Sequence, residues 1–151
     1  MSPTQPLIAW SNDFSIGIDE IDDQHKLLFD ALNRLWAAIL ERAGREAMMA
    51  IVEDLERYCR DHFTAEEAFM AATGYQDLAG HAAAHGLFVD RLAAEKKVVL
   101  AGGQLSLDLV KFLKDWLASH IRVSDKAYAE ALRQSNQPPV EADRFFQRLR
   151  G

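Results

Sequence analysis

Cysteine and proline are scarce in this chain, and no long apolar run is present. The one cysteine among 151 residues excludes an internal disulfide and suits a reducing compartment. All four prolines lie near the two ends, so none interrupts a helix between Trp10 and Leu132. No apolar stretch approaches the roughly 18 residues that span a bilayer, and the first six residues lack the features of a signal peptide. We therefore expect a cytoplasmic protein without membrane insertion.

Positive charge is also in short supply. Lysine and arginine number 17 against 23 aspartates and glutamates, which gives a net charge of −6. An acidic chain without a basic run repels phosphate backbones, so we expect no nucleic-acid partner. The hydrophobic share of 49% and the charged share of 26% are typical of a globular protein. A chain of this length corresponds to one domain.

Helical periodicity dominates what the sequence does contain. No segment sustains the two-residue alternation of a strand, whereas apolar residues recur at spacings of three and four, as in Leu28, Leu32 and Leu35. We predict an all-α, antiparallel up-down-up-down four-helix bundle, whose last helix is capped by Ser106 or a neighbour. The predicted helices cover about residues 19–42, 45–72, 78–100 and 106–133. They make a bundle over residues 19–133, between an N-terminal arm (1–18) and a C-terminal extension (134–151).

All five histidines fall on the inward faces of these helices. His62 lies four residues before Glu66, and the same spacing separates His81 from His85, so each pair shares one helix face. The other two, on the first and fourth helices, are His25 and His120. One such histidine alone is more often an ordinary hydrogen-bonded core residue. Burying five without partners would cost several kcal/mol per group, and a metal removes that cost, so we predict a shared metal site.

Asp125 follows His120 by five residues, an awkward spacing for a shared site. On a straight α-helix the two side chains would lie roughly 140° apart. They can meet only if the site is wide or if the helix is locally irregular. Taken alone, Asp125 would be an ordinary acid near a helix end. Glu67, next to Glu66, points roughly 100° away from it and is expected to be solvated.

Four motifs resemble those of the hemerythrins, and of their bacterial single-domain type in particular, over about residues 10–132. They are Asp22-Asp23-Gln24-His25-Lys26, His62-Phe63-x-x-Glu66-Glu67, His81-x-x-x-His85 and Trp116-Leu117-x-x-His120-Ile121-x-x-x-Asp125. The resemblance implies two non-haem iron ions joined by an oxo or hydroxo bridge.

The resemblance also implies which residues bind each iron. His81, His85 and His120 would bind one iron. His25 and His62 would bind the other. Glu66 and Asp125 would bridge both. With the solvent bridge, the first iron has six ligands and the second has five, which leaves one position open for a small molecule.

Reversible dioxygen binding, for transport or storage, is the function that the resemblance implies, with dioxygen held as peroxide on the five-coordinate iron. The protein would then not be an enzyme. Apolar side chains would line the open position, and the same side chains would also serve as bundle core. They are Leu28, Phe63, Phe88, Trp116, Leu117 and Ile121.

Three other functions could use a cluster of this kind. A zinc protease is disfavoured because Ala82 stands where a His-Glu-x-x-His motif has its general base. A ferritin-like oxidase is disfavoured because such sites are rich in glutamate. A sensor or scavenger of oxygen, peroxide or nitric oxide could use the same irons and stays open, although these 151 residues include no signalling domain. An oxygen-consuming partner protein is not identifiable from the sequence. Cys59 is expected to be a small core residue.

Overall fold

The computed structural model describes residues 5–134, and these form helices and loops without a strand. The predicted fold class is therefore confirmed, and each predicted helix begins and ends within about two residues of the observed one. The elements in chain order are η1 (Asn12–Phe14), α1 (Asp19–Leu40), α2 (Arg45–Thr73), α3 (Leu78–Leu100), α4 (Leu107–Ser119), η2 (His120–Asp125) and α5 (Lys126–Gln134).

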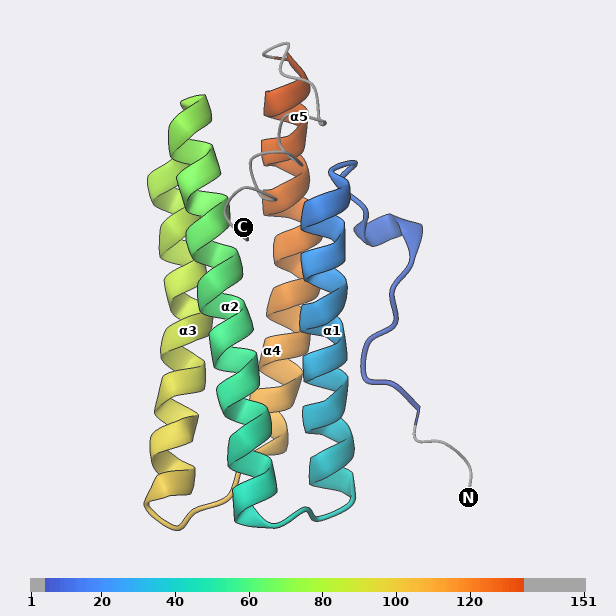
Figure 1. Ribbon diagram of the computed structural model, residues 1–151, viewed down its shortest axis with the longest axis vertical. Coiled ribbons are helices and arrows are strands. Elements are labelled where there is room, and N and C mark those ends of the chain that lie inside the picture. Colours follow the sequence, from blue (N-terminus) through green and yellow to red (C-terminus); the bar gives the residue numbers. More distant parts are fainter. Residues whose placement is uncertain (1–4, 135–151) are drawn as a thin grey trace.

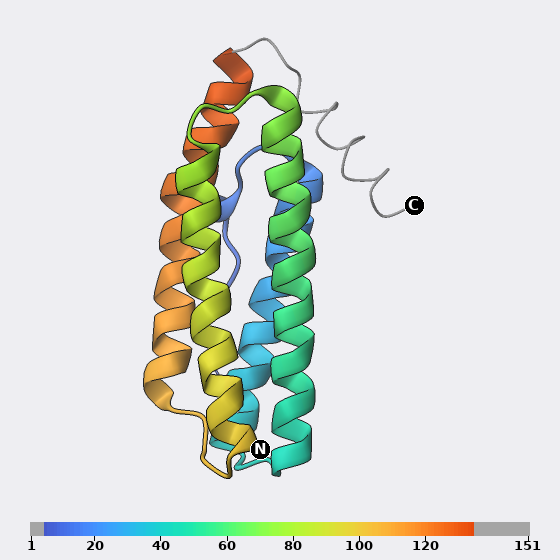
Figure 2. The ribbon, with the colours of Figure 1, turned by 90° about the vertical axis from the view of Figure 1, so that its left-hand side faces the viewer.

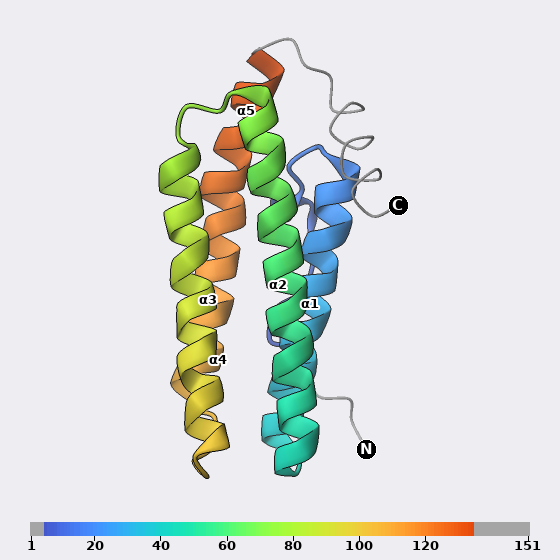
Figure 3. The ribbon, with the colours of Figure 1, turned by 60° about the vertical axis from the view of Figure 1, so that its left-hand side comes forward.

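Neighbouring helices run antiparallel and close into a four-helix bundle (Figures 1 and 2). α2 packs between α1 and α3, and α4 contacts both α1 and α3. α4, η2 and α5 follow one another as a single rod, which takes the place of the fourth predicted helix (Figure 3). We call the half of the bundle with the α2–α3 loop the upper half. The half with the α1–α2 and α3–α4 loops is the lower half.

Local signals fix where α2 ends and where α4 begins. Gly74 follows α2 with φ of 73°, a left-handed conformation that glycine adopts without strain. Its backbone N–H and that of Tyr75 bond carbonyls in the last turn of α2. The Ser106 hydroxyl accepts a hydrogen bond from the backbone N–H of Leu109 at 3.1 Å, so the predicted cap of the fourth helix is confirmed.

The N-terminal arm lies along α1 (Figure 1). Its aromatic residues pack onto the bundle, with the Phe14 ring edge-on to Phe29 at 4.9 Å between centroids. The buried Asp22 carboxylate accepts hydrogen bonds from the Ser15 hydroxyl at 2.6 Å and the Ile16 N–H at 3.0 Å. These bonds fasten the arm to the first turn of α1. The predicted extension, apart from its first residue, lies outside the described residues.

The interior of the bundle is apolar in its lower half. Leu35, Leu55, Leu109 and Leu113 are each at most 1% exposed. Cys59 is also buried, and burial raises the pKa of its thiol, which fits a core residue rather than a reactive one. Among the helices of residues 5–134, none has both the length and the apolar content needed to cross a bilayer.

Candidate metal centre

Histidines and carboxylates fill the interior of the upper half. The first turns of α1 and α3, the last turns of α2, and η2 all contribute to this cluster. Every member is buried, with between 1% and 6% of its surface exposed. The structure brings together all seven residues that the sequence singles out as metal ligands, namely His25, His62, Glu66, His81, His85, His120 and Asp125. We call these residues the seven-residue cluster.

The cluster divides into two groups that share a glutamate. The donor atoms of the larger group, Glu66 with His81, His85, His120 and Asp125, all lie within 4.8 Å of one another. The smaller group consists of His25, His62 and Glu66, within the same limit. The division matches the three-histidine and two-histidine sets that the family resemblance implies. It supports two metal positions rather than one.

Glu66 stands between the two groups through its two carboxylate oxygens. Oε1 lies 2.7 Å from His81 Nε2 and 3.3 Å from His85 Nε2. Oε2 faces the other group, 3.2 Å from His62 Nε2. One carboxylate therefore touches imidazoles of both groups, which is the position of a bridging ligand.

Asp125 spans the cluster in the same way. Its Oδ1 lies 3.0 Å from His81 Nε2 and 3.3 Å from His120 Nε2, in the larger group. Its Oδ2 lies 3.1 Å from His25 Nε2, in the smaller group. Both carboxylates thus reach both groups of imidazoles.

A π-helical turn explains how Asp125 reaches the cluster together with His120. η2 covers the six residues from His120 to Asp125 and interrupts the rod between α4 and α5. A π-helix joins residue i to residue i+5, so two side chains five apart lie one above the other instead of on different faces. Of the two explanations that the sequence left open, the structure supports the locally irregular helix.

Hydrogen bonding alone does not satisfy the cluster. Among the described residues, Glu66 Oε2 and both carboxylate oxygens of Asp125 are buried without a hydrogen bond of acceptable geometry. The Nε2 atom of His120 faces the Nε2 atoms of His85 and His81 at 3.0 and 3.2 Å. Two nitrogens this close cannot both point a proton at each other, so at least one of each pair presents a lone pair, and metal ions placed among them would accept such lone pairs. The donor set therefore fits a pair of metal ions.

The charges of the two cluster carboxylates also favour bound metal ions. Although burial favours the neutral form of both carboxyl groups, contacts with the surrounding imidazoles hold the pKa of Glu66 and Asp125 below the usual range. Burial also opposes the charge of His81, but its contacts with Asp125 and Glu66 raise its pKa to about 9. Two ionised carboxylates in an apolar bundle need positive partners, which bound cations would supply.

Two of the imidazoles are held from behind by polar side chains. The Nδ1–H of His85 donates to Glu67 Oε2 at 3.0 Å, and the Nδ1–H of His62 donates to Gln24 Oε1. Glu67 was expected to be solvated, and 34% of its side chain is exposed, but its carboxylate also reaches across from α2 to α3, which was not expected. Helix spacing gave no signal for either contact, because both join different helices.

Two aromatic rings lie flat against imidazoles of the larger group. Phe63 stacks on His85 with centroids 3.9 Å apart, and Trp116 stacks on His120 at 4.4 Å. The other residues predicted to line an open metal position are buried core residues, namely Leu28, Phe88, Leu117 and Ile121. They belong to the hydrophobic core of the bundle, and their part in lining a ligand position stays a prediction.

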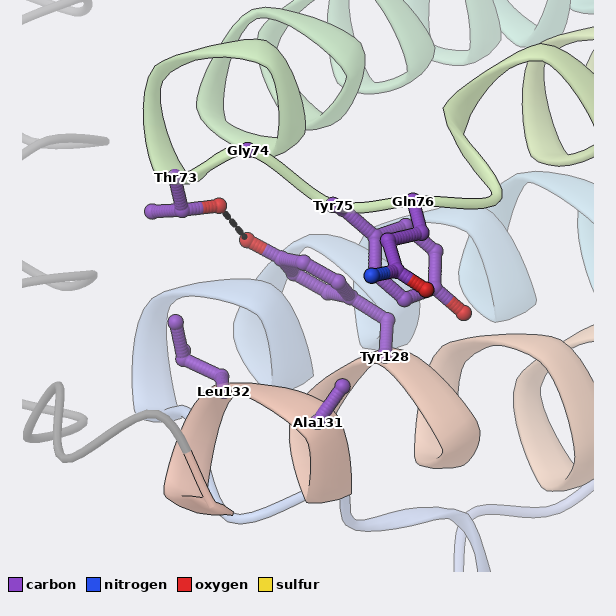
Figure 4. A pocket seen from close by; sticks show the side chains of 7 residues that line it. All are labelled: Thr73, Gly74, Tyr75, Gln76, Tyr128, Ala131 and Leu132. Carbon is purple, nitrogen blue, oxygen red and sulfur yellow. Dashed lines mark hydrogen bonds between the residues drawn. The ribbon is translucent and has the colours of Figure 1, made fainter.

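A small hollow of about 240 Å³ lies at the upper end of the bundle, between the end of α2 and α5. Figure 4 shows Tyr128 of α5 reaching across it to Thr73 at the end of α2, with 3.1 Å between the hydroxyl oxygens. Because the Thr73 hydroxyl donates to the Phe69 carbonyl at 3.0 Å, the Tyr128 hydroxyl is the donor to Thr73. The spacing of residues along the chain gave no indication of this link between the rod and α2.

Comparison with known proteins agrees with the geometry. Residues 16–132 match the family model described as "Hemerythrin HHE cation binding domain". A bacteriohemerythrin of Stenotrophomonas maltophilia is 35% identical over 127 residues, which cover 84% of this chain and 82% of that protein. A myohemerythrin of Theromyzon tessulatum is 31% identical over 119 residues, covering 79% and 88%. A crystal structure of wild-type hemerythrin superposes with a TM-score of 0.77 at 34% identity, covering 83% of this chain and 98% of that one.

Proposed function

The chain belongs to the hemerythrin family, whose cofactor is a pair of iron ions, and we propose that it binds dioxygen reversibly as a carrier or store. One observation carries the proposal: the buried cluster divides into a three-histidine and a two-histidine group that share carboxylates. Such a division offers the two irons unequal numbers of ligands. The iron with fewer ligands keeps a position where a small molecule can bind.

In this proposal His81, His85 and His120 hold one iron, and His25 and His62 hold the other. Glu66 and Asp125 are shared, as their contacts with imidazoles of both groups suggest. When bound, the irons supply electrons and the open position for dioxygen.

The remaining side chains keep that position dry. Leu28, Leu117 and Ile121 are each at most 2% exposed. Bound oxygen can leave either as dioxygen or as a reduced species, and the second route oxidises the irons irreversibly. An apolar wall that excludes water slows this second route and so favours release as dioxygen. All five histidines of the chain belong to the cluster, so no histidine is left over as a general acid or base. Both features favour a carrier over an enzyme.

Iron analysis combined with an oxygen titration of the reduced protein tests the proposal. We expect two irons per chain and one dioxygen bound per pair of irons. A visible absorption band should appear on oxygenation and vanish when oxygen is removed. A single iron per chain would contradict the two-group division. Immediate irreversible oxidation in air would contradict the carrier function and indicate a sensor or scavenger that uses the same site.

A charged substitution tests the apolar wall. Leu117→Asp should admit water and speed the irreversible oxidation of the oxygenated protein. Leu107→Asp makes a similar change in the same rod, at the start of α4 and at a residue that is 59% exposed, and it should leave the rate unchanged. Equal oxidation rates for the two variants would remove Leu117 from the wall.

A further inference from the structure

The two imidazoles that are held through Nδ1 have partners of different charge. His85, in the three-histidine group, donates to the carboxylate of Glu67, whereas His62, in the two-histidine group, donates to the amide oxygen of Gln24. The side chain of Glu67 is a carboxylate, whereas that of Gln24 is an uncharged amide. The two metal positions of the cluster therefore differ in the groups behind their histidines as well as in their number of histidines.

Both partners have the same effect on the geometry. A carboxylate or an amide oxygen can only accept a hydrogen bond, so each fixes the proton of its imidazole on Nδ1. The lone pair of Nε2 is then directed into the cluster. His85 Nε2 lies 3.3 Å from one oxygen of Glu66, and His62 Nε2 lies 3.2 Å from the other. Each imidazole is thus held with its ligand atom toward a metal position.

The electronic effects of the two partners differ. A hydrogen bond to a carboxylate is roughly twice as strong as one to a neutral acceptor, and it raises the basicity of the imidazole at its other nitrogen. A more basic ligand stabilises the ferric ion more than the ferrous ion. A neutral amide orients the ring without adding this effect.

We propose that Glu67 and Gln24 are positioning residues that set unequal reduction potentials for the two irons. Glu67 lowers the potential of the iron bound by His85, so that this iron is the first to be oxidised and the last to be reduced. Gln24 leaves the iron bound by His62 at the higher potential, and that iron retains its electron longer. The inference rests on the proposed di-iron function. It adds the order in which the two irons exchange their electrons, one electron for each iron.

The size of the effect follows from the exposure of Glu67. Since 34% of its side chain is in contact with solvent, water screens part of its charge. Changes to such outer partners alter metal affinity by about 10–100-fold, and we expect the lower end of that range. A tenfold change in the ferric-to-ferrous preference corresponds to about 59 mV for a one-electron couple.

Isosteric exchanges separate charge from positioning. Glu67→Gln keeps an acceptor oxygen for His85 but removes the charge, so the lower of the two potentials should rise by about 59 mV, a tenfold change. Gln24→Glu adds a charge behind His62, so the higher potential should fall by a similar amount. Glu67→Ala removes charge and acceptor together and should in addition speed the loss of iron to a chelator. Glu46→Gln, an exposed residue in the first turn of α2, controls for the change in net charge.

Redox titration of the iron-loaded protein without oxygen, followed by its visible spectrum, gives both potentials. The proposal is overturned if Glu67→Gln shifts neither potential more than Glu46→Gln does, or if Gln24→Glu moves the same potential as Glu67→Gln. Iron loss to a chelator provides a second measurement that needs no oxygen. Failure of reversible oxygen binding in the unmodified protein would contradict the proposed function but leave these potential shifts measurable.

Discussion

In the lower half of the bundle the helices face one another with leucines such as Leu35, Leu55 and Leu113, whereas in the upper half the same helices face one another with histidines and carboxylates. The interior side chains are buried in both halves, and the same rods run through both (Figures 1 and 2). The lower half is stabilised by the burial of apolar surface, which needs no cofactor. The upper half buries polar atoms that lack hydrogen bonds, so its stability depends on what binds there.

Removal of the metal should have the largest effect on stability, because only the upper half depends on a bound cofactor. A ligand present at a thousand times its Kd stabilises the folded state by about 4 kcal/mol, which corresponds to a fall in Tm of about 8–16 °C for a chain of this size when the ligand is removed. Thermal unfolding of the iron-free and iron-loaded proteins measures the difference. Equal melting temperatures would contradict a metal-dependent upper half.

Hydrogen exchange shows where that loss falls. In the iron-free protein, amides near His62 and His85 should exchange through local opening and therefore faster. Amides near Leu55 and Leu113 should still exchange only when the whole protein unfolds. Uniform loss of protection along α2 would mean that the two halves unfold as one unit.

Truncation of a lower-half leucine should have the next largest effect. Leu113 is fully buried, and Leu113→Ala should reduce the free energy of unfolding by about 2–5 kcal/mol through lost burial and a cavity. Because this residue lies away from the cluster, iron content and the visible spectrum should be unchanged. Chemical denaturation with and without iron checks that the loss of stability from Leu113→Ala and the loss from iron removal are additive. A variant that also lost iron would show that the halves are coupled.

The fold and the composition of the cluster could be predicted because both follow from regular α-helix geometry. The apolar spacing placed the third helix at the observed residues 78–100, and the same geometry put His62 with Glu66 and His81 with His85 on shared faces. The geometry fails where the helix is not regular. The wide separation expected for His120 and Asp125 assumed an α-helix, and η2 removes it with a π-turn. The spacing of residues along one helix cannot reveal this irregularity.

Contacts between helices were the other part that the sequence could not provide. The α-helical angle between Glu66 and Glu67 is correct, but the direction of one helix face says nothing about the side chain that meets it from the next helix. Glu67 points toward α3 and meets His85 there. Gln24 likewise meets a histidine of α2. Predicting these partners requires knowing how the helices are rotated against one another.

Loss of the hydroxyl that links α5 to α2 should give the smallest effect, again confined to the upper half. Tyr128→Phe removes the hydrogen bond to Thr73 seen in Figure 4 but keeps the ring. The Thr73 hydroxyl still donates to the Phe69 carbonyl, so no buried donor is left without a partner. We expect a loss of about 0.5–1.5 kcal/mol, or about 1–6 °C in Tm.

A double-mutant cycle separates this hydrogen bond from other effects of the two substitutions. Thr73→Val removes the same bond from the other side, and the double variant should cost less than the sum of the two single variants, because the bond can be lost only once. The bond helps to hold α5 directly after η2, so iron should also leave Tyr128→Phe faster than the unmodified protein. Additive stability losses together with an unchanged rate of iron release would mean that η2 holds Asp125 in the cluster without support from α5.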